Sequence, residues 1–333
     1  MAKRVAVVGV TGAVGVEMLK VLAERDYPVS ELVPLASARS AGKQITWKGG
    51  EHTVRELTPE SFKGVDVALF SAGGGISREY AVHATKAGCV VVDNSSAFRM
   101  KPGVPLVVPE VNPDAMTRHP GLIANPNCST IIAAVAVWPL YEYRRVKRMI
   151  VSTYQAVSGA GAAGLQELER QQRQKLSGEP VTCEKFKHPI VDNLFVHDTP
   201  VGENGYNEEE NKMRNETRKI FGDEKLLVAA TCVRVPVPRA HCESINLEFE
   251  RSISVAEVRQ ILSNTPGVKL VDDREGNHFP MPNEASDQDL VLVGHIRQDA
   301  SREDGRGIEL FVAGDQIRKG AATNAVQIAE RLL

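Results

Sequence analysis

Cys128 stands in the stretch NPNCST, residues 125–130, directly before an apolar run, Ile131 to Val137, that is typical of a buried helix. A cysteine at the start of a helix lies beside unpaired backbone N–H groups and the positive end of the helix dipole, and both stabilise a thiolate. The same N–H groups can hold the oxyanion that forms when a thiolate attacks a carbonyl. The residues themselves leave two interpretations open, a nucleophile and a packed core cysteine.

A nucleophilic thiol needs a base, and the segment RVPVPRAH, residues 234–241, supplies a histidine, His241, that we expect just past a strand. A lone histidine is more often structural, so this alternative stays open. The neighbouring Cys242 suggests a metal ligand, but no second ligand pair with suitable spacing is present, and we expect no metal. Cys89 and Cys232 lie inside β-rich runs and are interpreted as small core residues.

A glycine-rich turn, GVTGAVG at residues 9–15, follows the first predicted strand and opens the first predicted helix. Such glycines let the backbone turn tightly and approach a pyrophosphate, which then sits on the positive end of the helix. The spacing departs from G-x-G-x-x-G by one inserted residue, so a strand-to-helix turn without a ligand remains the alternative. The residues of the expected contact are Gly9, Thr11, Gly12, Ala13 and Val14.

The end of the second predicted strand indicates which nicotinamide cofactor is bound. An NAD site usually has Asp or Glu there, whereas this chain has LASARS, with Ser37, Arg39 and Ser40. An arginine and two hydroxyls hold a ribose 2′-phosphate that an acid would repel, which favours NADP; a solvated loop arginine is the alternative. Ala72 and Gly73, after a strand at residues 65–70, offer a second close approach to the cofactor.

The order of predicted elements indicates an α/β chain with two domains. Up to about Val108, short β-rich runs alternate with helical patterns, which predicts a Rossmann-like dinucleotide-binding domain with a parallel sheet. After residue 150 strands dominate, which predicts an α+β catalytic and dimerisation domain with a mostly antiparallel sheet. We place the domains at 1–127 and 128–313, with a C-terminal helix from about 314 to 333 packing back on the first.

Composition narrows the class of protein. A formal net charge of −2 argues against nucleic-acid binding, and five cysteines without C-x-x-C pairing favour a reducing cytoplasm over a disulfide framework. No apolar stretch approaches the roughly 20 residues that cross a bilayer, so we expect no membrane partner. Any charge on a substrate must therefore be met by local side chains.

Seven motifs together resemble the aspartate-β-semialdehyde dehydrogenase family, in the same order and over essentially the full chain. They are GVTGAVG, LASARS, DNSSAFR, NPNCST, YQAVSGAG, EEENK and RVPVPRAH. The resemblance implies NADPH-dependent reductive dephosphorylation of L-4-aspartyl phosphate to L-aspartate 4-semialdehyde through a thioester on Cys128. It also implies a place in the biosynthesis of lysine and diaminopimelate, methionine, threonine and isoleucine.

The resemblance also assigns roles to side chains. Cys128 matches the nucleophile, His241 the acid/base residue, and Gln155 the glutamine that orients the substrate. For the substrate, Arg234 matches the arginine that grips the α-carboxylate and Glu209 the acid that takes the ammonium, while Arg99, Lys212 and Asn127 remain for phosphate. Without the resemblance, the charged run at 208–212 reads as a solvated helix face, and Arg99 as a surface arginine.

Further cofactor contacts fall on Ser158, Gly159 and Gln316, the last at a position where relatives often carry Asn. Ala240 stands where many members have Gly. A homodimer or homotetramer is implied, with segments 165–175 and 180–206 as interface material. Two alternatives stay open: an enzyme like N-acetyl-γ-glutamyl-phosphate reductase, whose nucleophile has Gly before it and an aromatic residue after it, and a non-catalytic homologue that acts as a binding or scaffold protein.

Overall fold

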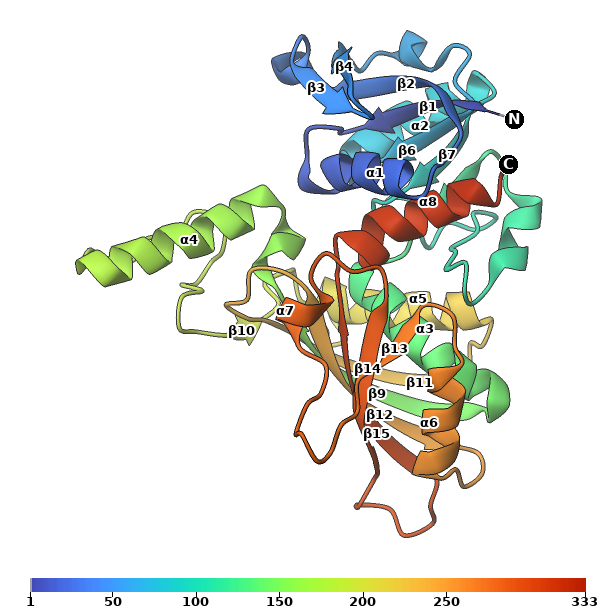
Figure 1. Cartoon of the computed structure of the whole chain (residues 1–333), viewed down its shortest axis with the longest axis vertical. Coiled ribbons are helices and arrows are strands. Elements are labelled where there is room, and N and C mark those ends of the chain that lie inside the picture. Colours follow the sequence, from blue (N-terminus) through green and yellow to red (C-terminus); the bar gives the residue numbers. More distant parts are fainter. Residues whose placement is uncertain (1) are drawn as a thin grey trace. The chain divides into compact units, whose positions relative to one another are not determined.

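The fold is taken from a computed structural model, which describes residues 2–333 (Figure 1). The chain divides into two compact units, one formed by residues up to Asn127 together with Gly320–Leu333, the other by Cys128–Lys319. The return to the first unit comes at Gly320, later than the sequence suggested, because Asp315 and Gln316 are still bonded to Arg239, Ser158 and Ala240 of the second unit.

The first unit is built on a six-stranded parallel sheet in the order β5-β2-β1-β6-β7-β8. This order reverses direction between β1 and β6, which is where doubly wound sheets bind dinucleotides. The elements are β1 (Lys3–Val8), α1 (Ala13–Glu24), β2 (Val29–Ala36), β3 (Gln44–Trp47), β4 (Gly50–Thr53), β5 (Arg55–Glu56), β6 (Val67–Phe70), α2 (Gly74–Lys86), β7 (Val90–Asp93), β8 (Leu122–Ala124) and α8 (Thr323–Glu330).

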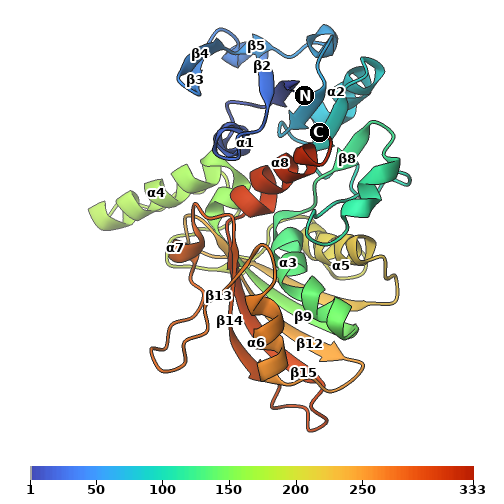
Figure 2. The ribbon, with the colours of Figure 1, turned by 45° about the vertical axis from the view of Figure 1, so that its right-hand side comes forward.

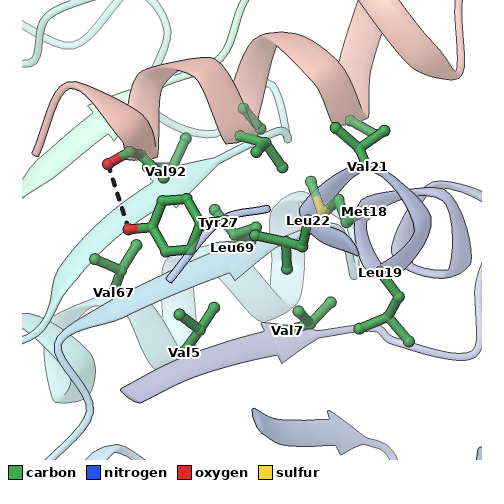
Figure 3. Packing of buried hydrophobic residues seen from close by; sticks show 14 of the residues in the cluster. Val5, Val7, Met18, Leu19, Val21, Leu22, Tyr27, Val67, Leu69 and Val92 are labelled. Carbon is green, nitrogen blue, oxygen red and sulfur yellow. Dashed lines mark hydrogen bonds between the residues drawn. The ribbon is translucent and has the colours of Figure 1, made fainter. Parts of the chain in front are cut away.

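The C-terminal helix α8 completes the core of the first unit. The sheet strands are buried Val-rich runs, as expected where helices cover a parallel sheet, and α1 and α8 pack side by side against them (Figure 3). The hydroxyl of Tyr27 donates to the Ala329 carbonyl at 3.3 Å, and Arg25 forms an ion pair with Glu330 at 2.7 Å. These bonds join α8 to residues that lie 302 and 305 positions earlier in the sequence.

The second unit is built on a seven-stranded mixed sheet in the order β10-β11-β9-β12-β15-β14-β13. The pairs β11–β9 and β13–β14 are parallel and the other four are antiparallel, so the expected mostly antiparallel sheet is confirmed. The elements are α3 (Cys128–Tyr143), β9 (Val146–Gln155), α4 (Ala162–Ser177), β10 (Phe195–Val196), α5 (Glu208–Phe221), β11 (Leu227–Arg234), β12 (His241–Phe249), α6 (Val255–Ser263), β13 (Val268–Leu270), α7 (Pro282–Ala285), β14 (Val291–Gln298) and β15 (Gly307–Gly314).

Helices cover one face of this second sheet. Helices α3, α5 and α6 pack on it, whereas α4 extends away from the sheet of its own unit (Figure 2). Helix α3 carries ten buried residues in its sixteen positions, which explains why its sequence shows a continuous apolar run in place of an amphipathic stripe. Among residues 2–333, no helix is long and apolar enough to span a membrane.

Candidate active site

The glycine turn after β1 has the geometry that a bound pyrophosphate requires. Gly9 has φ of +82°, and a Cβ built on it would lie 3.0 Å from the backbone nitrogen of Ala72, in the loop after β6. A Cβ on Gly15 would lie 2.2 Å from the Gly9 carbonyl oxygen. Helix α1 then begins at Ala13 with Gly12 as its N-cap and no side chain capping its first N–H groups. The turn is therefore tight enough, and its donors open enough, for a dinucleotide.

The loop after β2 carries the residues expected to choose between NADP and NAD. Ser37 and Arg39 are exposed beyond the end of the strand at Ala36, while Ser40 is buried. Within residues 2–333, Arg39 has no ion-pair partner, so its charge is available to a ligand. Because β2, β1 and β6 are neighbouring parallel strands, the loops that follow their carboxyl ends lie at one edge of the sheet.

Cys128 is the first residue of α3 and is half-buried, whereas Cys89 and Cys232, which lie in β-rich segments, are buried. Cys89 is 1% exposed and Cys232 is 0% exposed, which confirms their interpretation as core residues. Burial raises the pKa of the Cys89 thiol to about 12 and also raises that of Cys232. Of these three thiols, only Cys128 combines partial exposure with a helix N-terminus.

His241 is the first residue of strand β12, opposite Gly314 of β15. It comes seven residues after β11 ends at Arg234, so it begins a strand and does not directly follow one. It is fully buried, and its Nδ1 accepts the backbone N–H of Ala156 at 3.0 Å. In the neutral ring the proton must then sit on Nε2, which has no hydrogen-bond partner within residues 2–333. Burial, followed by the positive charge of Arg234, holds the pKa of His241 well below its usual range.

Four of the predicted site residues lie close together, at the carboxyl ends of β9 and β11 and the start of α5. Gln155 and Arg234 are the last residues of these strands and lie opposite each other in register. Gln155 Nε2 donates to Glu209 Oε1 at 3.1 Å, and Lys212 Nζ lies 3.0 Å from Glu209 Oε2. Glu209 is only 5% exposed, so the interpretation of this run as a solvated helix face is wrong for it. The neighbouring Glu210 is also buried, and it has a structural role: its carboxylate accepts the Asn207 N–H in the capping box of α5.

Arg234 is 3% exposed and is held by two fixed acceptors. Its Nη1 donates to the Ala156 carbonyl at 2.8 Å, and its Nη2 donates to His197 Nε2 at 2.7 Å. Burial lowers the pKa of Arg234, while the charges of Glu209 and Cys128 raise it. The sequence did not reveal His197, because it lies in a segment with few periodic signals.

The glycine-rich turn after β9 packs closely against the side chains of His241 and Arg234. A Cβ built on Gly159 would lie 3.1 Å from His241 Cε1 and 3.2 Å from Arg234 Nη1. Nearby, Gln316 Nε2 donates to the Ser158 hydroxyl and Gln316 Oε1 accepts the Ala240 N–H at 2.9 Å. In this arrangement the Gln316 amide bridges the turn and the loop that precedes His241. Its contact with a cofactor stays a prediction.

Arg99 and Asn127 belong to the first unit, and both are buried. Arg99 Nε donates to the Asn125 carbonyl and its Nη2 to the Asn94 carbonyl, each at 2.9 Å. The interpretation of Arg99 as a surface arginine is therefore wrong. Its bond to Asn125 links it to the segment that leads directly to Cys128.

The first unit has the strand order and the glycine turn of a dinucleotide-binding domain. The second unit has a cysteine at the start of α3, a buried histidine in β12 and a cluster of charged side chains. These features are typical of a nicotinamide-dependent dehydrogenase that uses a thiol. Family sequence models identify it further. Residues 4–119 match the semialdehyde dehydrogenase NAD-binding domain and residues 137–319 the semialdehyde dehydrogenase dimerisation domain. The chain belongs to the aspartate-semialdehyde dehydrogenase family, as the sequence motifs predicted.

Individual relatives agree over the whole chain. It is 52% identical to aspartate-semialdehyde dehydrogenase of Synechocystis, covering 99% of this chain and 97% of the relative, and 53% identical to that of Aquifex aeolicus, covering 100% and 98%. These relatives support the aspartyl enzyme over N-acetyl-γ-glutamyl-phosphate reductase.

Solved structures show the same fold. Aspartate semialdehyde dehydrogenase II of Vibrio cholerae, complexed with ASA, has a TM-score of 0.95 at 46% identity, covering 100% of this chain and 98% of that one. The Candida albicans enzyme, solved with NADP, has a TM-score of 0.77 at 26% identity, with the same coverage. The fold class, the oxidoreductase class and the nicotinamide cofactor predicted from the sequence are confirmed.

Proposed function

We propose that the chain carries out the reductive dephosphorylation of L-4-aspartyl phosphate to L-aspartate 4-semialdehyde through a thioester on Cys128. The observation that supports this most directly is the grouping, within one unit, of a helix-terminal thiol with the buried side chains of Gln155, Arg234 and His241. A carbonyl substrate with charged groups at its ends requires polar and charged side chains of this kind. Each charge of the substrate loses its hydration on binding and must be paired with a group of the protein.

The substrate residues are assigned by charge. Arg234 presents a planar guanidinium, which suits bidentate binding of the α-carboxylate better than an ammonium does. Glu209, already oriented by Gln155, takes the α-ammonium. Lys212 provides a donor for the phosphate within the second unit, and the phosphate role of Arg99 and Asn127 rests on the sequence resemblance alone.

The chemistry begins with the Cys128 thiolate, which the N-terminus of α3 and the Arg234 cation stabilise. The thiolate attacks the acyl carbon, the carbon–oxygen bond to phosphate breaks, and inorganic phosphate leaves with that electron pair. NADPH, when bound, supplies the hydride that reduces the resulting thioester. The tetrahedral thiohemiacetal then collapses, which releases the aldehyde and returns the electron pair to sulfur.

The hydrogen bond to Ala156 defines what His241 contributes. With its proton on Nε2, the neutral ring donates to the oxyanion that forms on the acyl oxygen in both tetrahedral states. To accept a proton from the thiol at Nε2, the ring would need its own proton on Nδ1. In that tautomer Nδ1 could no longer accept the Ala156 N–H. We propose the donor role for the neutral enzyme.

The cofactor residues are assigned to two sets. In the first unit, Gly9, Thr11, Gly12, Ala13 and Val14 would hold the pyrophosphate, Ser37, Arg39 and Ser40 the 2′-phosphate, and Ala72 and Gly73 the adjoining ribose. In the second unit, Ser158, Gly159 and Gln316 are cofactor residues by the sequence resemblance, and this assignment stays a prediction. The tightness of Gly9 and Gly159 is the physical reason to include them.

A second copy of the chain is the proposed partner. The sheet face opposite α3 leaves Tyr154 and Leu227 exposed, Leu176 is exposed near the end of α4, and Leu194 and Val201 are exposed in the segment that follows. Apolar groups gathered this way mark a protein interface. Of these residues, Leu194 and Val201 lie in the segment 180–206 that the sequence resemblance indicated, and the family description names a dimerisation domain. We propose a homodimer in the cytoplasm; sedimentation would show whether two dimers associate into a tetramer.

Substitution of the nucleophile tests the function. Cys128→Ala should abolish phosphate-dependent reduction of NADP with aspartate semialdehyde, whereas Cys183→Ala, at an exposed cysteine, should leave it intact. With phosphate omitted, mass spectrometry of the wild type should find an aspartyl adduct on Cys128 alone. Full turnover by Cys128→Ala would exclude the thioester route, and the absence of wild-type turnover would exclude the activity.

A further inference from the structure

His197 lies outside the set of residues that the motifs identify, yet it contacts the proposed carboxylate-binding arginine. It follows the short edge strand β10, and its backbone N–H donates to the Cys232 carbonyl of β11 at 2.8 Å. Its ring reaches across to Arg234, whose Nη2 lies 2.7 Å from His197 Nε2. The imidazole is therefore anchored by its own backbone at the edge of the sheet.

The direction of this hydrogen bond follows from chemistry. A guanidinium can only donate, so His197 Nε2 must accept through its lone pair. The ring proton is then on Nδ1, where the Thr199 hydroxyl lies 3.3 Å away. That hydroxyl is also 3.4 Å from the backbone nitrogen of Glu209, which links the ring to the start of α5.

Burial is the main reason that the imidazole of His197 is neutral. Burial lowers the pKa of His197 to about 4, and the cations Arg234 and Lys212 lower it, against the opposing effect of the carboxylates of Glu209 and Asp198. At neutral pH the imidazole is thus a fixed acceptor and not a second cation competing for an anion.

We propose that His197 is a positioning residue for substrate recognition: by accepting from Arg234 Nη2, opposite the Ala156 carbonyl that accepts from Nη1, it sets the plane in which the guanidinium meets the α-carboxylate. The proposal rests on the proposed function of Arg234. A long flexible side chain held at two points loses less conformational freedom when it binds a ligand. The remaining N–H groups of the guanidinium are left for the carboxylate.

A matched pair of amides tests this role. In His197→Gln the amide oxygen can take the place of Nε2 and accept from Arg234. In His197→Asn the shorter side chain places its amide near Nδ1, where it keeps the Thr199 contact and cannot reach the guanidinium. We expect His197→Asn to raise the KM for aspartate semialdehyde roughly tenfold or more, with the KM values for NADP and phosphate unchanged, and His197→Gln to remain close to the wild type.

A substrate without the carboxylate separates positioning from a general structural effect. With 3-aminopropanal, the same aldehyde lacking the α-carboxylate, wild type and His197→Asn should have equal kcat/KM. An equal loss with both aldehydes, or normal kinetics of His197→Asn with the semialdehyde, would overturn the proposal. Either result leaves the proposed function standing, since that depends on wild-type turnover and on Cys128.

Discussion

Glu243 gives the sharpest test of the physical account, because its carboxyl group is buried without a partner. It is 0% exposed in strand β12, on the same face as His241 and opposite Thr153 of β9. Within residues 2–333, neither of its oxygens has a hydrogen-bond partner. Burial raises the pKa of this carboxyl well above its usual value of 4.5, so the folded protein keeps it protonated at a pH where the unfolded chain has lost the proton.

The sign of the pH effect follows from this difference in protonation. Below the unfolded pKa both states bind the proton, and the carboxyl does not weaken folding. As pH rises, the unfolded chain ionises first and is stabilised, so the free energy of unfolding falls by about 1.4 kcal/mol per pH unit while the folded carboxyl keeps its proton. Glu243→Gln keeps the shape of the side chain and removes this titration.

The assay is urea unfolding of wild type and Glu243→Gln, followed by circular dichroism at pH 5.5 and pH 6.5 with the protein concentration held constant. The advantage of Glu243→Gln over the wild type should grow by about 1.4 kcal/mol between the two pH values. Glu203→Gln, at an exposed position, controls for the loss of one carboxylate. An advantage that stays the same at both pH values would refute the reasoning, because it would mean that the folded carboxyl is already ionised or shares its proton with a neighbour.

Three further substitutions test separate parts of the site. Arg39→Glu should weaken NADP binding far more than NAD binding in a titration, and equal losses would contradict the 2′-phosphate assignment. Ala240→Gly should raise the free energy of unfolding by ~1 kcal/mol, because Ala240 has φ of +68° and glycine relieves this left-handed strain; a lower stability by urea unfolding would show that the Cβ packs favourably. Gly159→Ala should lower kcat, since its Cβ would press on His241; unchanged kcat together with an unchanged fold would show that the ring has room to move.

Local patterns were sufficient for the elements that carry the cofactor. The glycine spacing predicted a strand, a tight turn and a helix, because only glycine tolerates both the left-handed φ of Gly9 and the close approach at Gly15. The position of Cys128 before an apolar run likewise predicted a helix start, and the structure begins α3 at that residue. In both cases the cause lies within a few neighbouring residues.

The charged run at 208–212 could not be interpreted locally. Its charged composition is typical of an exposed helix. Glu209 is nevertheless buried and is hydrogen-bonded to Gln155, which lies in a strand more than fifty residues earlier. His197 was missed for the same reason, since its significance is a bond to Arg234 across a strand pairing. A sequence pattern reports periodicity, and neither contact leaves a periodic signal.

The sequence by itself determined the alternation of strands and helices, the glycine turn after the first strand and the location of a thiol at a helix N-terminus, because each depends on short-range sterics and hydrogen bonding. Only the tertiary structure decided which proton position His241 adopts, which acid is desolvated and which groups fix Arg234. Those properties depend on burial and on partners brought together by sheet pairing, and the low polarity of a packed interior is what turns such contacts into shifted pKa values and fixed donors.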